Sequence, residues 1–321
     1  MRIKKIALLT SGGDSPGMNA AIRSVVRCAL FNGLEVTGIL RGYEGAIEGE
    51  LCPLNHRSVS NIINRGGTIL KTARSQRFFT HEGQRKAVDT LKKNKIDALV
   101  VIGGNGSYRG ADVLFREWGV ATIGLPGTID NDLCGTDQTI GCQTAVHTAL
   151  EAIDKIRDTA HSMERIFIVE VMGRQSGYIA LEVALGSGAE DVIIPERPYD
   201  YESMYKDILE GHRKGKVSWI IVVAEGAGKA HEIAAKITQV TKLESRFVVL
   251  GHIQRGGSPS GPDRILATRL GVACVESLLK GRYGKAVGVL QNNIHLTDLA
   301  QACHSEKLKI EEYDRLMKIL R

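Results

Sequence analysis

Two carboxylates stand two residues apart in the short glycine-containing segment Pro126–Asp132, which directly follows an apolar run. Two ionised acids this close are costly to hold together. Asp130 and Asp132 make sense as a pair if one accepts a proton and the other holds Mg²⁺. Phosphoryl transfer needs both: a base for the attacking hydroxyl and a metal on the donor phosphates. The alternative is a polar, solvated turn, where Asp and Asn are common.

Two glycine-rich segments, Thr10–Asn19 and Gly103–Gly110, also follow apolar runs. Glycines let the backbone approach a ligand, and a helix that follows offers free N–H groups to an anion. The first segment suits a phosphate cradle or a tight turn equally well. The second departs from the dinucleotide fingerprint, because position 109 is arginine, and it also lacks the P-loop pattern. A phosphate-binding loop of another class remains open.

A third segment, Gly251–Pro259, combines His252 and Arg255 with a double glycine. Arginine contacts phosphate through two parallel hydrogen bonds, which suits recognition of a phosphorylated sugar. A lone histidine in such a place is more often structural.

Short apolar runs alternate with amphipathic stretches and would position these segments. The runs predict strands at Lys5–Thr10, Leu34–Leu40, Ala98–Gly103, Ala121–Leu125, Arg165–Val171, Asp191–Pro195, Ser218–Ala224, Phe247–Gly251 and Ala286–Leu290. Helical spacing predicts helices at Met18–Asn32, Gln84–Lys93, Thr139–Thr159, Ser203–Lys214, Ala230–Lys242 and Asp263–Lys280. Ala98–Ile102 and Trp219–Val223 are apolar at successive positions, which is typical of parallel strands buried on both faces. We therefore expect an α/β fold with two lobes, each a mostly parallel sheet sandwiched by helices.

Composition narrows the function classes. The 321 residues exceed what one core usually serves, so two domains are expected. The net charge of +6 has no polybasic block and only 5% of residues are aromatic, which argues against nucleic-acid binding. The first apolar run is too short to span a membrane. Six scattered cysteines without a C-x-x-C pair indicate reduced thiols in a cytoplasm.

In this order and spacing, the segments resemble the bacterial-type 6-phosphofructokinases. The resemblance runs from Lys5 to about Asn292, with further motifs at Asn64–Thr68, Ala73–Arg74, Asp154–Thr159, Val171–Arg174 and Ile194–Glu196. It implies a phosphofructokinase-like fold and transfer of a phosphoryl group from MgATP to the 1-hydroxyl of fructose 6-phosphate. The products would be fructose 1,6-bisphosphate and ADP, in the committed and allosterically regulated step of glycolysis.

The resemblance also implies roles for individual residues. Asp130 would be the base, Thr128 would contact the transferring phosphoryl, and Asp132 would help to hold Mg²⁺ or order the loop. Arg74 and Arg174 would offset charge developing on the phosphates. The nucleotide site would be lined by Gly13, Arg74, Gly104, Asn105, Gly106, Ser107 and Gly110. The sugar phosphate would be held by Met172, Gly173, Arg174, Glu225, His252 and Arg255, and its 6-phosphate by Arg165 and Arg246 of a neighbouring subunit.

Members of this family are homotetramers with an effector site at another subunit contact. The residues that match it are Arg23, Arg27, Arg157, Gly188, Glu190, Lys214 and Lys216. Two positions depart from the pattern, since His56 replaces an arginine and Asn61 an aspartate. We expect an anionic effector, a nucleotide or a molecule like phosphoenolpyruvate. Because Arg23 and Arg27 are four apart on a predicted helix, a solvated helix face is the alternative.

The two lobes of the family are discontinuous in sequence. The resemblance predicts a nucleotide-binding lobe of residues 1–141 and 254–304, and a sugar-phosphate-binding lobe of residues 142–253 and 305–321. Relatives that use pyrophosphate carry an acidic residue at position 106 and a lysine at position 127. Gly106 and Gly127 therefore favour ATP as the donor.

Asn105 is the departure that matters most, because the family has an aspartate near Mg²⁺ at this position. We expect altered Mg²⁺ dependence and reduced turnover, with Asp130 still present as the base. Two alternatives stay open. One is a non-catalytic sensor of sugar phosphate or nucleotide, which Asn105 suggests, and the other is transfer from pyrophosphate.

Overall fold

The computed structural model describes residues 3–305 and 308–320, and the chain folds into two compact units. Unit 1 comprises Met1–Thr144 and Arg255–Glu306, and unit 2 comprises Ala145–Gln254 and Lys307–Arg321. The lobe boundaries expected from sequence, 141/142, 253/254 and 304/305, differ from these by a few residues at most. Which substrate each unit binds stays a prediction.

Unit 1 contains a seven-stranded sheet in the order β11-β10-β5-β4-β1-β2-β3. The strands are β1 (Lys5–Thr10), β2 (Glu35–Ile39), β3 (Leu51–Leu54), β4 (Ala98–Gly103), β5 (Ala121–Pro126), β10 (Lys285–Leu290) and β11 (Asn293–Asp298). The five inner strands are parallel, and an antiparallel strand closes each edge. Because β5, β4 and β1 are neighbours, the segments that follow them leave the sheet side by side.

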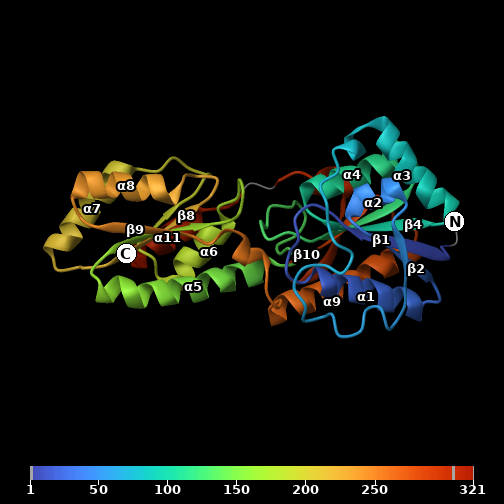
Figure 1. Cartoon of the computed structure of the whole chain (residues 1–321), viewed down its shortest axis with the longest axis horizontal. Helices are drawn as coiled ribbons and strands as arrows, with labels where there is room; N and C mark the ends of the chain where they lie inside the picture. Colours follow the sequence, from blue (N-terminus) through green and yellow to red (C-terminus); the bar gives the residue numbers. More distant parts are fainter. Residues whose placement is uncertain (1–2, 306–307, 321) are drawn as a thin grey trace. The chain divides into compact units, whose positions relative to one another are not determined.

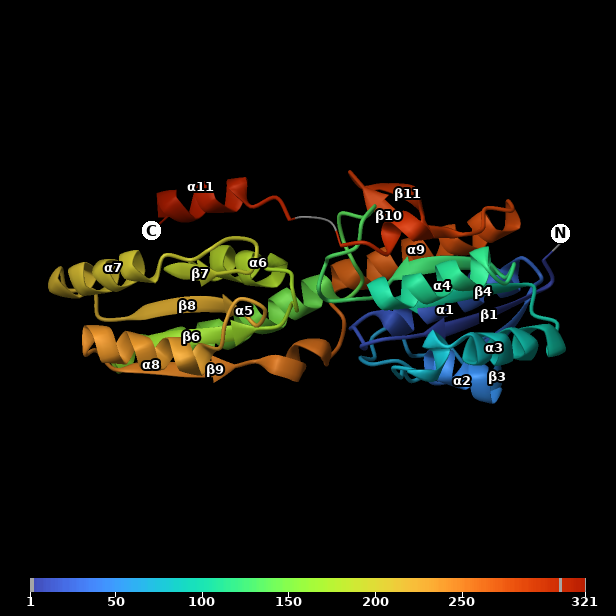
Figure 2. The same cartoon turned by 90° about the horizontal axis from the view of Figure 1, so that it is seen from above.

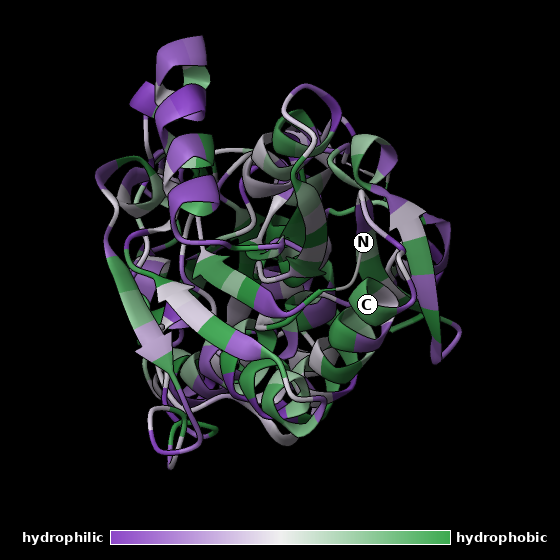
Figure 3. Cartoon of the chain, turned by 90° about the vertical axis from the view of Figure 1, so that its right-hand side faces the viewer, coloured by the Kyte–Doolittle hydropathy of each residue, from purple (hydrophilic) through white to green (hydrophobic). Residues whose placement is uncertain are grey.

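Helices cover both faces of this sheet (Figure 1). One face carries α1 (Met18–Phe31) and α9 (Gly261–Leu279), and the other carries α2 (Gly42–Glu48), α3 (His81–Lys93) and α4 (Asn105–Arg116). The short helices η1 (Arg77–Phe79) and α10 (Leu299–Ala302) complete the unit. Side chains of β1 alternate between the two cores: Ile6 and Leu8 face α1 and α9, while Ala7 and Leu9 face the other layer. Hydrophobic residues follow the strands and hydrophilic ones the outer turns of the helices (Figure 3).

Unit 2 contains a four-stranded parallel sheet in the order β7-β8-β6-β9. Its strands are β6 (Ile166–Val171), β7 (Asp191–Ile193), β8 (Trp219–Ala224) and β9 (Ser245–Val249). Its helices are α5 (Cys142–Ser162), which begins in unit 1, α6 (Tyr178–Ser187), α7 (Tyr201–Arg213), α8 (Ala230–Thr241), η2 (Gly251–Arg255) and α11 (Glu311–Leu320). Helices α7 and α8 pack on one face, against Ile168 and Ile221, and α11 lies beside α6 (Figure 2). The Tyr313 hydroxyl of α11 donates to Glu182 of α6.

The predicted α/β fold of two helix-covered, mostly parallel sheets is confirmed. Two details were wrong. In the segment Gly103–Gly110 only Gly104 lies outside a strand or helix, because β4 ends at Gly103 and α4 already begins at Asn105. The predicted helix start at Thr139 is also wrong, because α5 begins at Cys142 and Ile140 instead pairs with Gly127.

Within the described residues, no helix is long and apolar enough to cross a membrane. The same residues contain no group of three or more His, Cys, Asp or Glu side chains placed to hold a metal ion.

Candidate active site

The segment Pro126–Asp132 leaves the carboxyl end of β5 and turns back into the protein. Thr128 and Asp130 are buried, with 8% and 4% of their surface exposed. The Thr128 hydroxyl accepts a hydrogen bond from the Asp130 backbone N–H at 3.2 Å. Asn131 takes a left-handed conformation with φ of 47°, which asparagine tolerates better than most residues. The acid predicted to be the base therefore sits on a folded, well-packed loop.

Three predicted loops meet at this edge of the sheet. The Gly127 N–H donates to the Gly103 carbonyl at 3.0 Å, which ties the segment after β5 to the segment after β4. The Ser107 hydroxyl donates to the Ser11 carbonyl at 3.0 Å, which ties the start of α4 to the segment after β1. A side chain at Gly104 would lie 3.5 Å from Thr128. The glycine segments and the acidic loop thus form one site in unit 1.

Helix α4 brings its N-terminus into this site. Its N-cap is Gly104, and neither that residue nor an acid in the first turn covers the free N–H groups. Unpaired N–H groups and the positive end of the helix dipole favour a negative ligand such as a phosphate. Gly106 lies in this first turn and is exposed, and a Cβ added to it would meet no atom within 4 Å, so the fold itself does not require glycine there.

Asn105 contacts the second acid of the loop. Its hydrogen-bonding partners assign the amide orientation: the nitrogen donates to both carboxylate oxygens of Asp132 at 3.1 and 3.2 Å, and the oxygen accepts from the Ser305 hydroxyl at 3.0 Å. The amide therefore satisfies the Asp132 carboxylate by a direct hydrogen bond. The predicted metal residues Asn105 and Asp132 are adjacent, and the contact between them is a hydrogen bond.

At other positions of the predicted nucleotide site, close packing requires a glycine, because a Cβ would clash with a neighbouring side chain. A Cβ at Gly13 would come within 2.6 Å of the Arg255 guanidinium, which donates to the Asp14 carbonyl at 3.0 Å. A Cβ at Gly110 would meet the Tyr43 ring at 2.8 Å. The Tyr43 hydroxyl in turn donates to the Ser107 carbonyl at 2.6 Å, and burial raises the pKa of this phenol.

Two predicted arginines also lie in unit 1. Arg255, which we predicted beside the sugar, contacts the first glycine loop there. Arg74 lies in the same unit and is exposed.

In unit 2, a second group of predicted residues meets at the carboxyl ends of β6 and β8. Glu225 accepts hydrogen bonds from the backbone N–H groups of Gly173 and Arg174, at 3.2 and 2.9 Å. Gly173 has a φ of 143°, and a Cβ there would clash with the Ser176 carbonyl at 2.4 Å. His252 is exposed in η2.

Gln254 is a residue of this group to which the sequence assigned no role. Its side chain is fully buried, accepts from the Met172 N–H at 2.8 Å and donates to the Ala145 carbonyl at 3.4 Å. A buried glutamine at the end of a polar segment, two residues after a histidine, has no local signal that would separate it from a solvated one.

The two arginines predicted to bind the 6-phosphate share one carboxylate. Arg165 donates to Glu244 at 2.9 Å, and Arg246 forms an ion pair with the other oxygen of the same side chain. They lie at the start of β6 and on β9, which are adjacent strands. The pair of cations predicted from sequence is therefore brought together.

The predicted effector residues form separate groups in the two units. In unit 2, Arg157 donates to the carbonyls of Ser187 and Gly188 at 2.7 and 3.0 Å, and Lys216 pairs with Glu190 at 3.1 Å. Lys214 pairs with Glu210 at the end of α7, not with Glu190. In unit 1, His56 and Asn61 are exposed in the segment after β3.

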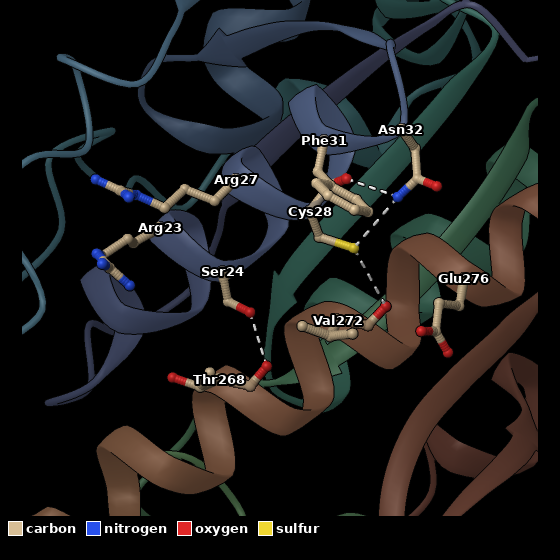
Figure 4. A pocket seen from close by; sticks show the side chains of 9 residues that line it. All are labelled: Arg23, Ser24, Arg27, Cys28, Phe31, Asn32, Thr268, Val272 and Glu276. Atoms are coloured by element: carbon tan, nitrogen blue, oxygen red, sulfur yellow. Dashed lines mark hydrogen bonds between the residues drawn. The ribbon is translucent and has the colours of Figure 1, made fainter.

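Arg23 and Arg27 line a pocket of about 400 Å³ on α1 and α9 (Figure 4). The two guanidinium groups extend to the same side of α1, and Phe31, Cys28 and Glu276 lie farther along the groove. The Ser24 hydroxyl donates to the Thr268 carbonyl at 2.7 Å and ties the two helices together. The two arginines therefore belong to a hollow and not only to a solvated helix face.

The fold is an α/β fold in which an acidic loop is tied to the start of a helix whose free N–H groups suit a phosphate, an arrangement fitted to phosphoryl transfer. The chain belongs to the phosphofructokinase family, whose model matches residues 5–278. It is 55% identical to ATP-dependent 6-phosphofructokinase 1 of Thermus thermophilus over 307 residues, which are 95% of either chain. It is 54% identical to ATP-dependent 6-phosphofructokinase 1 of Clostridium perfringens, again over 95% of each chain.

Solved structures agree on the fold. Phosphofructokinase from Saccharomyces cerevisiae superposes with a TM-score of 0.89 at 38% identity, over 94% of this chain and 45% of the yeast chain. A pyrophosphate-dependent phosphofructokinase from Marinobacter aquaeolei gives a TM-score of 0.85 at 23% identity, over 99% and 91% of the two chains. At that identity the second likeness concerns the fold alone.

Proposed function

We propose that this protein is an ATP-dependent 6-phosphofructokinase, which transfers the γ-phosphoryl group of ATP to the 1-hydroxyl of fructose 6-phosphate. The observation that carries the proposal is the buried Asp130 on a loop tied to the N-terminal segment of α4. Relatives named ATP-dependent 6-phosphofructokinase, at 54–55% identity over 95% of the chain, support it. They also favour an active enzyme over a non-catalytic sensor.

Asp130 acts as the general base. Its carboxylate takes the proton from the 1-hydroxyl as that oxygen bonds to the γ-phosphorus, and the bond from phosphorus to the β–γ bridging oxygen breaks to release ADP. The N–H groups at the start of α4 and the Thr128 hydroxyl stabilise the charge on the transferring group. Arg74 of the same unit adds positive charge, the electrostatic contribution that usually dominates this chemistry.

Mg²⁺ fits the oxygen atoms of this site. Mg²⁺ is commonly held by one or two carboxylates together with substrate phosphates and water, and Asp132 offers one half-buried carboxylate. When bound, the ion would neutralise the donor phosphates. Asn105 offers an amide where the family has an acid, so the protein contributes one negative charge fewer.

ATP is favoured over pyrophosphate by the space around two glycines. Gly106 faces open space, which leaves room for a nucleotide. At Gly127 a Cβ would lie 2.9 Å from Ile102 and 3.1 Å from Met18, so a lysine would disturb the packing of the loop.

The sugar phosphate is held by the group around Glu225 and Gly173, with Arg165 and Arg246 reaching its 6-phosphate from a neighbouring subunit of a homotetramer. The cations offered to an anionic effector, such as a nucleotide or a phosphoenolpyruvate-like molecule, form two separate groups: Arg23 and Arg27 beside the pocket of unit 1, and Arg157 and Lys216 in unit 2. The enzyme works in the cytoplasm. Its six cysteines, all free thiols in the structure, support a reducing compartment.

A coupled assay for fructose 1,6-bisphosphate tests the function. We expect activity with ATP and at most a trace with pyrophosphate. Asp130→Asn should lower kcat at least about 100-fold, since it removes the base but keeps the shape. Asp137→Asn is the matched control, because Asp137 is an exposed acid on the same connection, and it should stay near wild-type activity. Equal activity of wild type and Asp130→Asn would mean that Asp130 is not the base.

A further inference from the structure

The catalytic loop is held from behind by a second stretch of chain, residues 139–141. The Ile140 N–H donates to the Pro126 carbonyl at 2.8 Å, and Ile140 forms an isolated parallel bridge with Gly127. This stretch therefore extends the β-type pairing beyond the end of β5 and fixes the first residues of the loop.

Thr139 fixes the middle of the loop. Its side chain is fully buried, and its hydroxyl donates to the Thr128 carbonyl at 2.7 Å. Its backbone N–H donates to the Asn131 side-chain oxygen at 2.8 Å. One residue thus contacts the loop on both sides of Asp130.

Asp263 in turn holds residues 139–141 in place through a hydrogen bond from the Gly141 backbone N–H. This carboxylate is fully buried at the start of α9, and it accepts the backbone N–H groups of Gly141 and Thr144 at 2.8 Å each, as well as the Thr144 hydroxyl. Gly141 and Thr144 flank the first residues of α5, so the acid satisfies N–H groups that a helix start leaves free. The Ser260 hydroxyl, the N-cap of α9, donates to the same carboxylate at 3.2 Å.

These contacts form one path within unit 1, from α9 through Asp263 and residues 139–141 to Thr128 and Asp130. We propose that Thr139 and Asp263 are positioning residues of the phosphoryl transfer. They touch no substrate and hold the Asp130 loop in its reactive geometry. The inference rests on the proposed kinase function. Misplacement of a reacting group by about 1 Å costs on the order of 100-fold in rate, so loss of the Thr139 contact is expected to appear in kcat.

The test compares two buried threonines of unit 1. Thr122 on β5 is also fully buried, and its hydroxyl donates to the Ala111 carbonyl at 3.0 Å, away from the loop. Thr139→Val and Thr122→Val each remove one buried hydroxyl of the same kind. We expect both to lower Tm. Only Thr139→Val should lower kcat, by about 10- to 100-fold with little change in KM for either substrate. Thr139→Ser, which keeps the hydroxyl, should restore kcat.

Two results would overturn the inference. One is an equal kcat for Thr139→Val and Thr122→Val at equal folded fraction, and the other is a Thr139→Ser variant as slow as Thr139→Val. If Thr139→Val does not fold, Thr139→Ala is compared with Thr122→Ala under the same criteria. Absence of activity in the wild type would instead contradict the proposed function, so the two failures are distinct.

Discussion

Compared with the aspartate of the family, Asn105 removes one negative charge from the site. Its amide still links the start of α4 to the acidic loop. Its amide donates to Asp132 at 3.1 and 3.2 Å, so a direct hydrogen bond joins the loop after β5 to the start of α4. An aspartate at this position would place two carboxylates about 3 Å apart and would need a metal ion or a proton to hold them. The site is thus assembled before the nucleotide arrives.

Asn105→Asp should make the stability of the protein depend on Mg²⁺. Repulsion between the two carboxylates is expected to cost about 1–4 kcal/mol in the metal-free protein. We expect Tm to fall in EDTA and to recover when Mg²⁺ is added, whereas the wild-type Tm should respond little to either. Differential scanning calorimetry without nucleotide measures this directly, and the Mg²⁺ dependence of activity should shift in the same variant.

Asn94→Asp is the control for this variant. It adds the same charge to unit 1 at the C-cap of α3, where the side chain donates to the Thr90 carbonyl. Its Tm should not respond to Mg²⁺. Identical melting of Asn105→Asp and wild type in EDTA would refute the bridging role of the amide.

Residue types indicated only part of the site. Asp130 and the glycine segments could be predicted, because closely spaced acids and glycines are unusual after a strand. Thr139, Gln254 and Asp263 could not, because a buried threonine, glutamine or aspartate looks like any polar residue until its partners are known. The hydrogen bond of Arg255 to the Asp14 carbonyl and the ion pair of Lys214 with Glu210 could not be predicted either, because several local partners compete for a long side chain.

At the scale of elements, the N-terminal residues of α5 and α9 donate hydrogen bonds to the same buried carboxylate, that of Asp263. Burial raises the pKa of this acid above its ordinary value of 3.8, while hydrogen bonds from Thr144, Gly141 and Ser260 offset part of the shift. A carboxyl whose folded pKa is raised binds its proton more tightly in the folded state. Its contribution to the free energy of unfolding therefore falls as pH rises from about 3.8 through the raised pKa.

Asp263→Asn should expose this dependence, because the variant lacks the titration. The unfolding free energy of the wild type minus that of the variant should be largest in acid, fall as pH rises above about 4, and then level off. Urea unfolding at a series of pH values gives the difference. Glu50→Gln serves as the opposite control: a hydrogen bond from Arg41 lowers the pKa of Glu50, so its contribution is present at higher pH and is lost in acid. A difference for Asp263→Asn that grows with pH would contradict the assignment.

In the unit 1 sheet, the inner strands were predicted well from the sequence, whereas the two edge strands were not predicted. Parallel strands buried on both faces, such as β4, have uniformly apolar sequences. The antiparallel edge strands β3 and β11 were missed, because β3 contains Pro53 and β11 is mostly polar and exposed. The glycines at the start of α4 favour a loop, although the helix already includes Gly106 and Gly110. The start of α5 was placed too early because Ile140 fits the helical spacing, although Gly141 has a φ of 104°.

At the scale of the whole molecule, β9 is the edge strand of the unit 2 sheet and carries exposed apolar residues. Phe247 and Val249 are 51% and 53% exposed on the same side of the strand, next to Arg246. An exposed apolar edge is a common place for pairing with another chain. It fits the proposed subunit contact through which Arg165 and Arg246 would reach a neighbour's sugar phosphate.

Val249→Asp should weaken that contact, because an ionised carboxylate would be buried without a partner. We expect a smaller assembly in analytical ultracentrifugation and a KM for fructose 6-phosphate raised at least about tenfold, as a charged contact to the 6-phosphate is lost. Val240→Asp on α8, where the valine is 50% exposed, should change neither quantity. An intact tetramer with the wild-type KM in Val249→Asp would place the subunit contact elsewhere.

The discontinuous units also set an order for folding during translation. The ribosome completes the central strands of unit 1 early, but α9, which covers α1 on one face of that sheet, begins only at Gly261, and β10 and β11 follow later still. All four strands of unit 2 are synthesised before α9 appears. The four-stranded sheet of unit 2 can therefore form while unit 1 still exposes the apolar face of α1, and α11 joins unit 2 last of all. Apolar surface exposed in this way is prone to aggregation, so the nascent unit 1 stays at risk until α9 has emerged and covers α1.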